Sequence, residues 1–233
     1  KVTDETALKG GVSCYAYTIP DQYFLMSSCQ VGGLLLKWFK NNFSHVEIEK
    51  ARQSGRDVYD VMTDCAPKGP SDVMVLPHFI GSGTPWNDLD SRGAIVGLTI
   101  DSTRHDIVKA IMDSLTYEFK INMQFYESMG FRLREMRVVG GASKSPLWMQ
   151  LKANILNREV ASLREKDAAC LGAAMIAMWS RGVYASLEEA AAACVRLDRV
   201  FSPDSAVVDA YGRAYEKYTH LYDALKEFNR IKI

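Results

Sequence analysis

Residues 137–184 constrain the fold of this chain more than any other stretch, because strand and helix signals alternate there. An apolar run at 136–139 predicts a short strand, and Gly140 and Gly141 follow it as a turn. Ser145 comes next, directly before a proline. Serine caps free backbone amides and proline suits the first helical turn, so an amphipathic helix is predicted to start there.

A second strand and a second helix follow in the same stretch. Residues 160–163 predict the strand. Asp167 precedes a run of small residues at 168–181, which predicts a capped helix that Gly182 ends. Because one side of this helix carries only small residues, we expect it to pack closely on a sheet or another helix. Gly172→Leu would then overpack this contact and lower the free energy of unfolding by about 1–3 kcal/mol. The alternation predicts an α/β domain with a mixed sheet and flanking helices.

Caps, turns and apolar periodicity predict the remaining elements up to residue 137. They are a linker at 1–10, a β-hairpin with strands at 11–19 and 23–28, a helix at 31–39, helical turns at 46–66, strands at 73–76 and 94–99, and a helix at 103–130. Thr103 and Asp106 form a capping-box pattern at the start of the last helix. Its predicted buried stripe recurs every three or four residues and includes Ile111 and Phe119.

The end of the chain reads as helical. Ser186 and Glu189 form a second capping-box pattern before an alanine-rich helix. Residues 195–201 are predicted to cross back over the surface. Ser202, followed by proline, is predicted to cap one last helix through 229, whose tyrosines pack inward.

Composition excludes several classes of protein. The 233 residues contain 28 Lys+Arg and 28 Asp+Glu, which argues against nucleic-acid binding through a general basic field. No apolar run approaches the roughly 18 residues of a membrane span. The five cysteines are scattered and never form C-x-x-C, which predicts reduced thiols in a cytoplasm. Cys170 and Cys194 lie among alanines and are predicted to be small core residues.

The Gly140-Gly141 turn allows two interpretations. Glycines between a strand and a helix start let backbone approach a phosphate, and the helix end supplies free N–H groups and a positive dipole. The same turn also serves chain geometry in proteins that bind nothing there. The P-loop pattern is absent, since Lys144-Ser145 lacks the preceding glycine spacing.

Three segments carry a family resemblance. GGASKSPLWMQLKANILNREV, followed by ACLGAAMIAMWSRGVY, resembles the carboxy-terminal domain of FGGY-type carbohydrate kinases (xylulokinase- or glycerol kinase-like). GAIVGLTIDSTRHDIVKAIMD is similar to that family's second signature, and LPHFIGSGTPWNDLDSRG to the loop before it. The resemblance covers nearly the whole chain.

The resemblance implies a fold and an activity. The fold would be the ribonuclease-H-like fold shared with actin and hexokinase, with residues 1–233 as one carboxy-terminal domain and the amino-terminal domain absent. The activity would be transfer of the ATP γ-phosphoryl group to a sugar or polyol hydroxyl, with ATP and Mg²⁺. The partners would be that substrate and the protein's own amino-terminal domain, and they would include neither nucleic acid nor a membrane. The resemblance is compatible with a homodimer. The chain begins at Lys1 and is expected to be cut from something longer.

The resemblance also implies site residues, all of them on the nucleotide side. The residues expected to contact the nucleotide are Gly33, Lys37, Gly140, Gly141, Ala142 and Ser145. Ser145 stands where some glycerol kinases have asparagine, so it is either a nucleotide contact or a plain helix cap. No catalytic base and no metal ligand is assigned to this chain, because the family's catalytic aspartate lies before the matching part. We therefore expect the chain by itself to be inactive.

Two alternatives stay open. Asp88 and Asp90 in the loop at 77–92 would either bind a metal or form a capped turn. The chain as a whole would either be half of a kinase or a non-catalytic nucleotide-binding or regulatory actin-like module. The identity of the sugar does not follow from the sequence.

Overall fold

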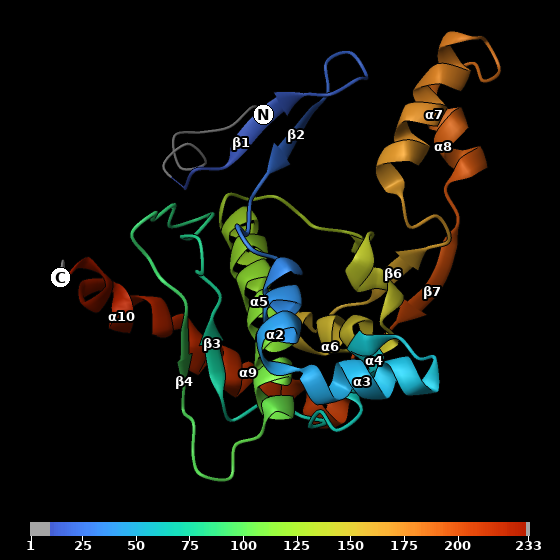
Figure 1. Ribbon diagram of the computed structural model, residues 1–233. Helices are drawn as coiled ribbons and strands as arrows, with labels where there is room; N and C mark the ends of the chain where they lie inside the picture. The colour runs from blue at the N-terminus through green and yellow to red at the C-terminus, as the bar shows by residue number, and fades with distance from the viewer. Residues whose placement is uncertain (1–9, 232–233) are drawn as a thin grey trace.

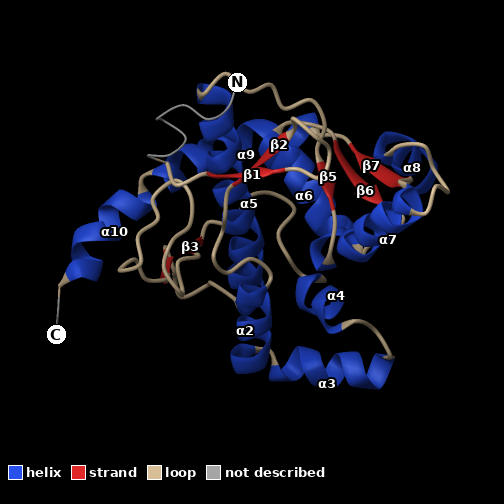
Figure 2. Ribbon diagram, turned by 90° about the horizontal axis from the view of Figure 1, so that it is seen from above, coloured by secondary structure: helices blue, strands red, loops and turns tan. Residues whose placement is uncertain are grey.

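The computed structural model describes residues 10–231, and the predicted linker at 1–10 lies almost entirely outside them. The long helix α5 (Arg104–Ser128) runs through the middle of the molecule, and the other elements are arranged around it (Figures 1 and 2). Its first turn is fastened by the predicted capping box, in which Thr103 and Asp106 bond to each other's backbone. None of the described helices has both the length and the apolar composition needed to cross a bilayer.

The elements before α5 confirm most of the local predictions. They are β1 (Ser13–Ala16), β2 (Tyr23–Met26), α2 (Leu34–Phe43), α3 (His45–Ser54), α4 (Val58–Thr63), β3 (Met74–Leu76) and β4 (Ala94–Val96). The helix predicted at 31–39 starts three residues later and continues to Phe43. Gly55 adopts φ +67° after α3 and separates it from α4.

The elements after α5 include the predicted strand–turn–helix unit. They are β5 (Arg137–Val138), a 3₁₀ turn (Gly141–Lys144), α6 (Pro146–Leu156), β6 (Val160–Leu163), α7 (Ala168–Ser180), α8 (Leu187–Cys194), β7 (Leu197–Phe201), α9 (Ser205–Thr219) and α10 (Leu221–Arg230). Residues 195–201 were expected to cross the surface. That expectation is wrong, because most of the segment forms β7 and pairs antiparallel with β6.

The described strands form three small sheets instead of one. β1 pairs with β2 and β3 with β4, both antiparallel. Only the third sheet is mixed: β5 runs parallel to β6, and β7 runs antiparallel to it. The α/β character and the flanking helices agree with the prediction, while the continuous sheet is absent from the described part of the chain.

The largest core cluster packs α5 against α2, β3, α6 and α9. α5 is covered on more than one side, so its buried surface is wider than the predicted stripe. Ile111 is buried as expected, whereas Phe119 is 45% exposed. Lys109, Asp113 and Glu118 are buried instead. They are tolerated there because Lys109 pairs with Asp113 and Glu118 accepts from Tyr218 OH at 2.6 Å, partners that periodicity does not predict.

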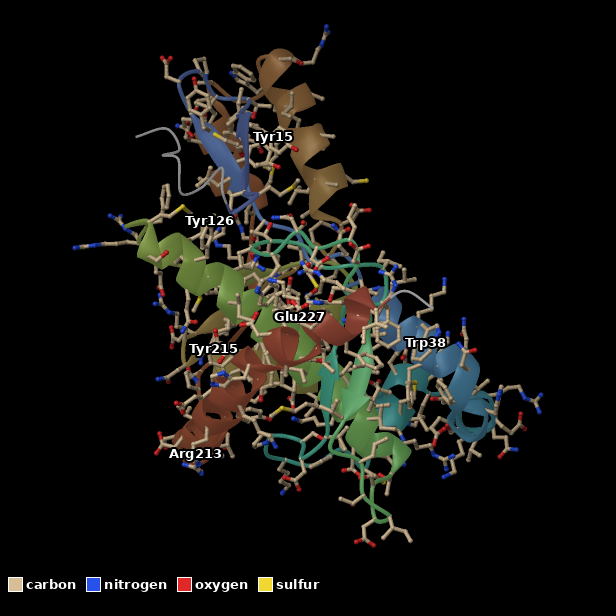
Figure 3. All side chains as sticks on the ribbon, turned by 90° about the vertical axis from the view of Figure 1, so that its left-hand side faces the viewer. Tyr15, Trp38, Tyr126, Arg213, Tyr215 and Glu227 are labelled. Carbon is tan, nitrogen blue, oxygen red and sulfur yellow. The ribbon has the colours of Figure 1, made fainter. Side chains whose placement is uncertain are left out.

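The last helix is interrupted and starts later than predicted. Ser202 Oγ bonds to Glu159, so Asp204 caps α9 by accepting from the Ala206 N–H at 3.0 Å. A turn at His220 then separates α9 from α10. The predicted inward face is confirmed, since four tyrosines of α9 and α10 are buried: Tyr211, Tyr215, Tyr218 and Tyr222. Figure 3 shows Arg213 of α9 low in the molecule, far from Tyr15 on the hairpin at the top.

α7 lies beside another helix, as expected, but the close packing expected at Gly172 is wrong. None of its residues is buried, and a Cβ added at Gly172 would meet nothing within 4 Å. α7 lies beside α8, and the pair stands at the edge of the molecule, away from α5 (Figure 1). Cys170 is exposed and Cys194 only half-buried, so neither is the predicted core residue. Small residues allow close packing, but they do not determine which other element lies against them.

Candidate functional site

The turn between β5 and α6 is built on glycine geometry. Gly140 has φ +77° and ψ −163°, a backbone conformation that residues with a Cβ rarely adopt. Its N–H donates to the Lys166 carbonyl at 3.2 Å, which ties the turn to the segment after β6. Ser143 Oγ donates back to the Gly140 carbonyl at 2.8 Å. The turn therefore has one defined shape.

Ser145 caps α6 as the sequence predicts. Its Oγ accepts from the Trp148 backbone N–H at 3.3 Å, and Pro146 occupies the first helical position. α6 thus presents its amino-terminal end, with its partial positive charge, beside the glycine turn. That end can attract a phosphate or another anionic group.

Three glycines around this turn are open to solvent. A Cβ built at Gly33, Gly140 or Gly141 would meet nothing within 4 Å. Gly83 and Gly93 differ, because a Cβ there would lie within 2.2 Å of other atoms. Packing therefore does not explain glycine at the three open positions, and their exposed backbone is available to a ligand.

A cavity of about 650 Å³ lies in front of the glycine turn. Four parts of the chain contribute to it: the turn with the start of α6, the start of α2, the helix α4, and the first half of α5. Its floor is apolar and comes from Leu36, Met62, Val108, Met112 and Trp148, all of which are buried. Its rim is polar and includes Asp57, Tyr59, Asp60, Thr63 and Lys144. An apolar slot with a polar rim is the usual form of a site for a flat small molecule.

Four of the six predicted site residues line this cavity. Gly33, Gly141, Ala142 and Ser145 come together there although more than a hundred residues separate Gly33 from the others. Gly140 shapes the turn without lining the cavity. Lys37 is exposed and also outside the lining.

The side of the cavity opposite to the glycine turn could not be predicted from the sequence. Tyr59, Asp60 and Thr63 belong to α4, a six-residue helix capped by Asp57, and no motif singles them out. Val108 and Met112 from α5 read as ordinary core residues. Only Trp148 had a usable signal, because it lies in the first turn of the helix that follows the glycines.

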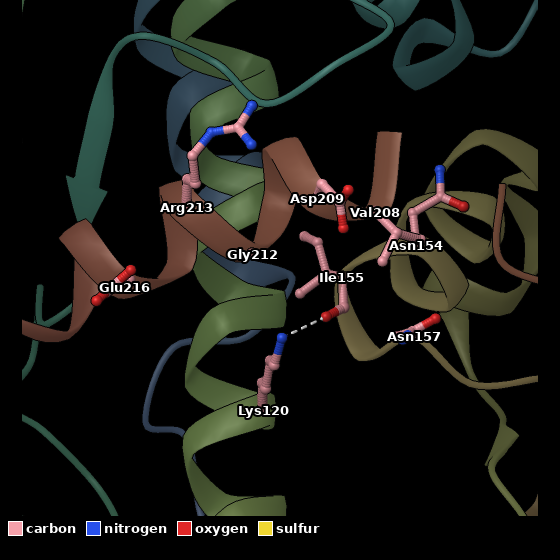
Figure 4. A pocket seen from close by; sticks show the side chains of 9 residues that line it. All are labelled: Lys120, Asn154, Ile155, Asn157, Val208, Asp209, Gly212, Arg213 and Glu216. Atoms are coloured by element: carbon pink, nitrogen blue, oxygen red, sulfur yellow. Dashed lines mark hydrogen bonds between the residues drawn. The ribbon is translucent and has the colours of Figure 1, made fainter. Parts of the chain in front are cut away.

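A second hollow of about 420 Å³ lies between α5, α6 and α9 (Figure 4). Lys120 donates to the Ile155 carbonyl at 2.8 Å and lies 4.4 Å from the centre of the Tyr215 ring, so this lysine is already engaged. Asp209, Arg213 and Glu216 are exposed and of mixed charge. No predicted site residue lines this hollow, and its groups converge on no single ligand chemistry.

The acidic loop at 77–92 forms a turn. The Asp90 N–H donates to Asp88 Oδ1 at 2.9 Å, and Tyr222 OH donates to Asp88 Oδ2 at 2.8 Å. These bonds support the capped-turn interpretation of the two aspartates. Within residues 10–231, no three His, Cys, Asp or Glu side chains are grouped closely enough to hold a metal ion.

A family model matches most of the chain. The description "FGGY family of carbohydrate kinases, C-terminal domain" fits residues 2–181, which include the glycine turn and α7.

Individual proteins agree with that match. A xylulose kinase of Bacillus subtilis (strain 168) is 27% identical over 225 residues, which cover 97% of this chain and 44% of that protein. A glycerol kinase of Brevibacillus brevis is 33% identical over 186 residues, covering 79% of this chain and 36% of that protein. The solved structure of a xylulose kinase from Rhodospirillum rubrum superposes with a TM-score of 0.79 at 23% identity and covers 94% of this chain and 43% of its own. The chain thus spans less than half the length of these relatives.

Proposed function

This chain belongs to the FGGY family of carbohydrate kinases, and from that membership we propose that it forms the nucleotide-binding half of a sugar or polyol kinase. Its fold is the ribonuclease-H-like fold of the actin and hexokinase type that the solved kinases share. The complete gene product that contains residues 1–233, called the complete protein below, would transfer the γ-phosphoryl group of ATP to a hydroxyl of its substrate.

The cavity beside the glycine turn is the observation on which this proposal depends. Its apolar floor suits the base of ATP, and the open backbone at Gly33 and Gly141 suits the ribose and phosphates. Ser145 and the start of α6 add a hydroxyl and a positive helix end. Phosphoryl transfer is governed mainly by positioning and by neutralising charge, so a rigid glycine turn beside a helix start fits that chemistry.

ATP is the co-substrate that the family implies, and we propose that Mg²⁺ accompanies it. Mg²⁺ retains several waters and usually binds through one or two carboxylates together with substrate phosphates. No residue of this chain is assigned to it.

We propose that the rest of the complete protein covers two apolar surfaces of this chain. Four aromatic side chains of the β1–β2 hairpin are 43–57% exposed: Tyr15, Tyr17, Tyr23 and Phe24. α7 consists almost entirely of apolar residues and buries none of them. Surfaces of this kind mark interaction sites. The catalytic carboxylate and most of the sugar pocket would belong to the covering domain.

The five free cysteines favour a reducing compartment such as the cytoplasm.

A coupled assay of ADP release tests the proposal. The complete protein, with ATP and Mg²⁺, is offered pentuloses, glycerol, gluconate and deoxy sugars, and we expect turnover with at least one of them. Residues 1–233 alone should give no sugar-dependent turnover, because losing the general base typically costs about 10²–10⁴-fold and losing acceptor positioning costs more. Nucleotide binding by the complete protein without turnover on any acceptor would instead favour a non-catalytic nucleotide-binding module. Turnover by residues 1–233 alone would place the catalytic base in this half.

A further inference from the structure

The helix α4 forms the wall of the cavity opposite to the glycine turn, and its two faces differ. Val61 and Met62 are buried. Tyr59, Asp60 and Thr63 line the cavity. Residues three and four apart share a helix face, so these three side chains form one strip along α4. The wall opposite to the glycine turn is therefore polar, although the cavity floor is apolar.

Asp60 is the acidic side chain of this wall that the fold leaves free. Asp57 Oδ1 accepts from the Tyr59 N–H at 2.8 Å and caps the helix. Arg56 forms two hydrogen bonds with the carboxylate of Asp64, both at 2.7 Å. Asp60 is exposed, and its carboxylate has neither a hydrogen-bond partner nor an ion-pair partner in the part of the chain that the structure describes. Both of its oxygens are thus available to a donor on a ligand.

The charges around the cavity give a bound nucleotide one favourable orientation. Lys144 is exposed and lines the cavity beside the start of α6, so positive charge gathers on that side. Asp57 and Asp60 place negative charge on the side of α4. Phosphates are attracted to the first side and repelled by the second. The nucleoside part therefore lies toward α4.

Within the nucleoside, the base and the ribose suit different parts of this side. The base is flat and fits the apolar floor, to which Met62 of α4 contributes. The ribose carries two hydroxyl groups, which suit the polar rim. A carboxylate that accepts from a ribose hydroxyl is a recurrent feature of nucleotide sites. Asp60 lies on that rim with its oxygens free, so it matches the ribose.

We propose that the Asp60 carboxylate accepts a hydrogen bond from a ribose hydroxyl of the nucleotide, which makes Asp60 a specificity-determining residue that favours ribonucleotides over deoxyribonucleotides. The inference rests on the proposed function, because it assumes that ATP enters this cavity. It assigns to α4 the recognition of the nucleotide's own sugar, a role that no motif in the sequence indicates.

Calorimetry on the complete protein tests the proposal with ADP, 2′-deoxy-ADP and 3′-deoxy-ADP. We expect at least one deoxy analogue to bind the wild type about 3- to 10-fold more weakly than ADP, because it lacks the hydroxyl that Asp60 binds. In Asp60→Ala, ADP and that analogue should bind equally. Comparing the two ligands within one variant cancels the general effect of removing a negative charge near the phosphates. Asp60 is exposed, so its replacement should leave the fold intact.

Asp209→Ala is the matched control. Asp209 is also exposed on a helix, but it lines the hollow of Figure 4 instead of the nucleotide cavity. This variant should discriminate between ADP and the deoxy analogues as the wild type does. The inference is overturned if the wild type binds ADP and both deoxy analogues equally, or if Asp60→Ala still discriminates between them.

A further ligand separates the ribose from the base. Purine riboside diphosphate lacks the exocyclic amine of adenine and keeps both ribose hydroxyls. If Asp60→Ala abolishes discrimination against this ligand alone, Asp60 binds the base and the inference is overturned. If the wild type binds no ADP, the proposed function itself fails. That result is distinguishable from ADP binding without any effect of the ribose hydroxyls, which overturns only the role of Asp60.

Discussion

At the scale of single residues, Lys152 lies beside the candidate site, with its Nζ 5.0 Å from the centre of a Trp148 ring. It is half-buried, and burial lowers its pKa from the ordinary value of 10.5 to about 8, although the neighbouring Cys29 acts in the opposite direction. The folded protein therefore releases this proton at a lower pH than the unfolded chain does. Between about pH 8 and 10.5 the unfolded chain binds more protons, so Lys152 makes stability rise with pH in that window.

Replacing Lys152 should show how much its partly buried charge destabilises the folded protein. Below pH 8 the cost of holding the charge in the folded protein is fully present, so Lys152→Met should be more stable than the wild type at pH 7. The difference should shrink as the pH rises from 8 to 10.5. Urea unfolding at a series of pH values measures it, with the exposed Lys37→Met as control. A stability difference that is independent of pH would contradict this account.

The residues of the turn could be predicted because their signals are local. Within six residues, a strand end, a turn and a helix cap are indicated by Gly140, Gly141 and Ser145. The burial of Trp148, whose Nε1–H has no partner within residues 10–231, and the partial burial of Lys152 have no such signal. They depend on which other segments close around α6, and this is decided by contacts far apart in the sequence.

At the scale of elements, a buried charged pair fastens α5 to its neighbours. Lys109 Nζ lies 2.6 Å from Asp113 Oδ1, and it also donates to Tyr211 OH of α9 at 2.8 Å. The second oxygen of Asp113 accepts from the Ser71 N–H at 3.0 Å, just before β3. One pair of charges thus connects α5, α9 and the segment that leads into β3.

Removing one partner should destabilise this junction strongly. Lys109→Met leaves the Asp113 carboxylate buried with only the Ser71 donor, which should cost about 3–5 kcal/mol. Tyr211→Phe removes a single hydrogen bond and should cost about 1 kcal/mol. Denaturant unfolding compares the two variants. If Lys109→Met costs no more than Tyr211→Phe, the pair does not have the structural role described here.

Caps and packing differ in how well the sequence predicts them at this scale. Thr103, Ser145, Asp167 and Ser186 all cap helices at the predicted positions, because a cap involves only neighbouring backbone. The environment of α7 was predicted wrongly, since its small residues say nothing about what lies opposite. β7 was missed because its strand pairing with β6 is set from another part of the chain.

At the scale of the whole molecule, the candidate nucleotide cavity and the exposed apolar surfaces are formed by different elements. The cavity is formed by α4, the starts of α2 and α6 and the first half of α5, and its apolar floor belongs to the main core cluster. The hairpin and α7 project at the end away from α9 (Figures 1 and 3). The family resemblance predicted membership of the FGGY kinases, and the match of the family model to residues 2–181 confirms it. The three separate sheets could not be predicted, because strand signals identify strands without their partners.

Nucleotide binding at the glycine turn is tested most directly by a pair of glycine variants. Gly141 and Gly212 both have open space around an added Cβ, and neither has a positive φ. Only Gly141 lines the nucleotide cavity, whereas Gly212 lines the hollow of Figure 4. The two valine variants should therefore place a similar side chain in two different surface hollows with little disturbance of the fold.

The measurement is calorimetric titration of the complete protein with ADP, together with circular dichroism to check folding. We predict that Gly141→Val lowers ADP affinity at least tenfold, because its side chain occupies space that the nucleotide needs, while Gly212→Val binds ADP like the wild type. If Gly141→Val is folded and binds ADP as tightly as the wild type, the nucleotide does not lie at this turn.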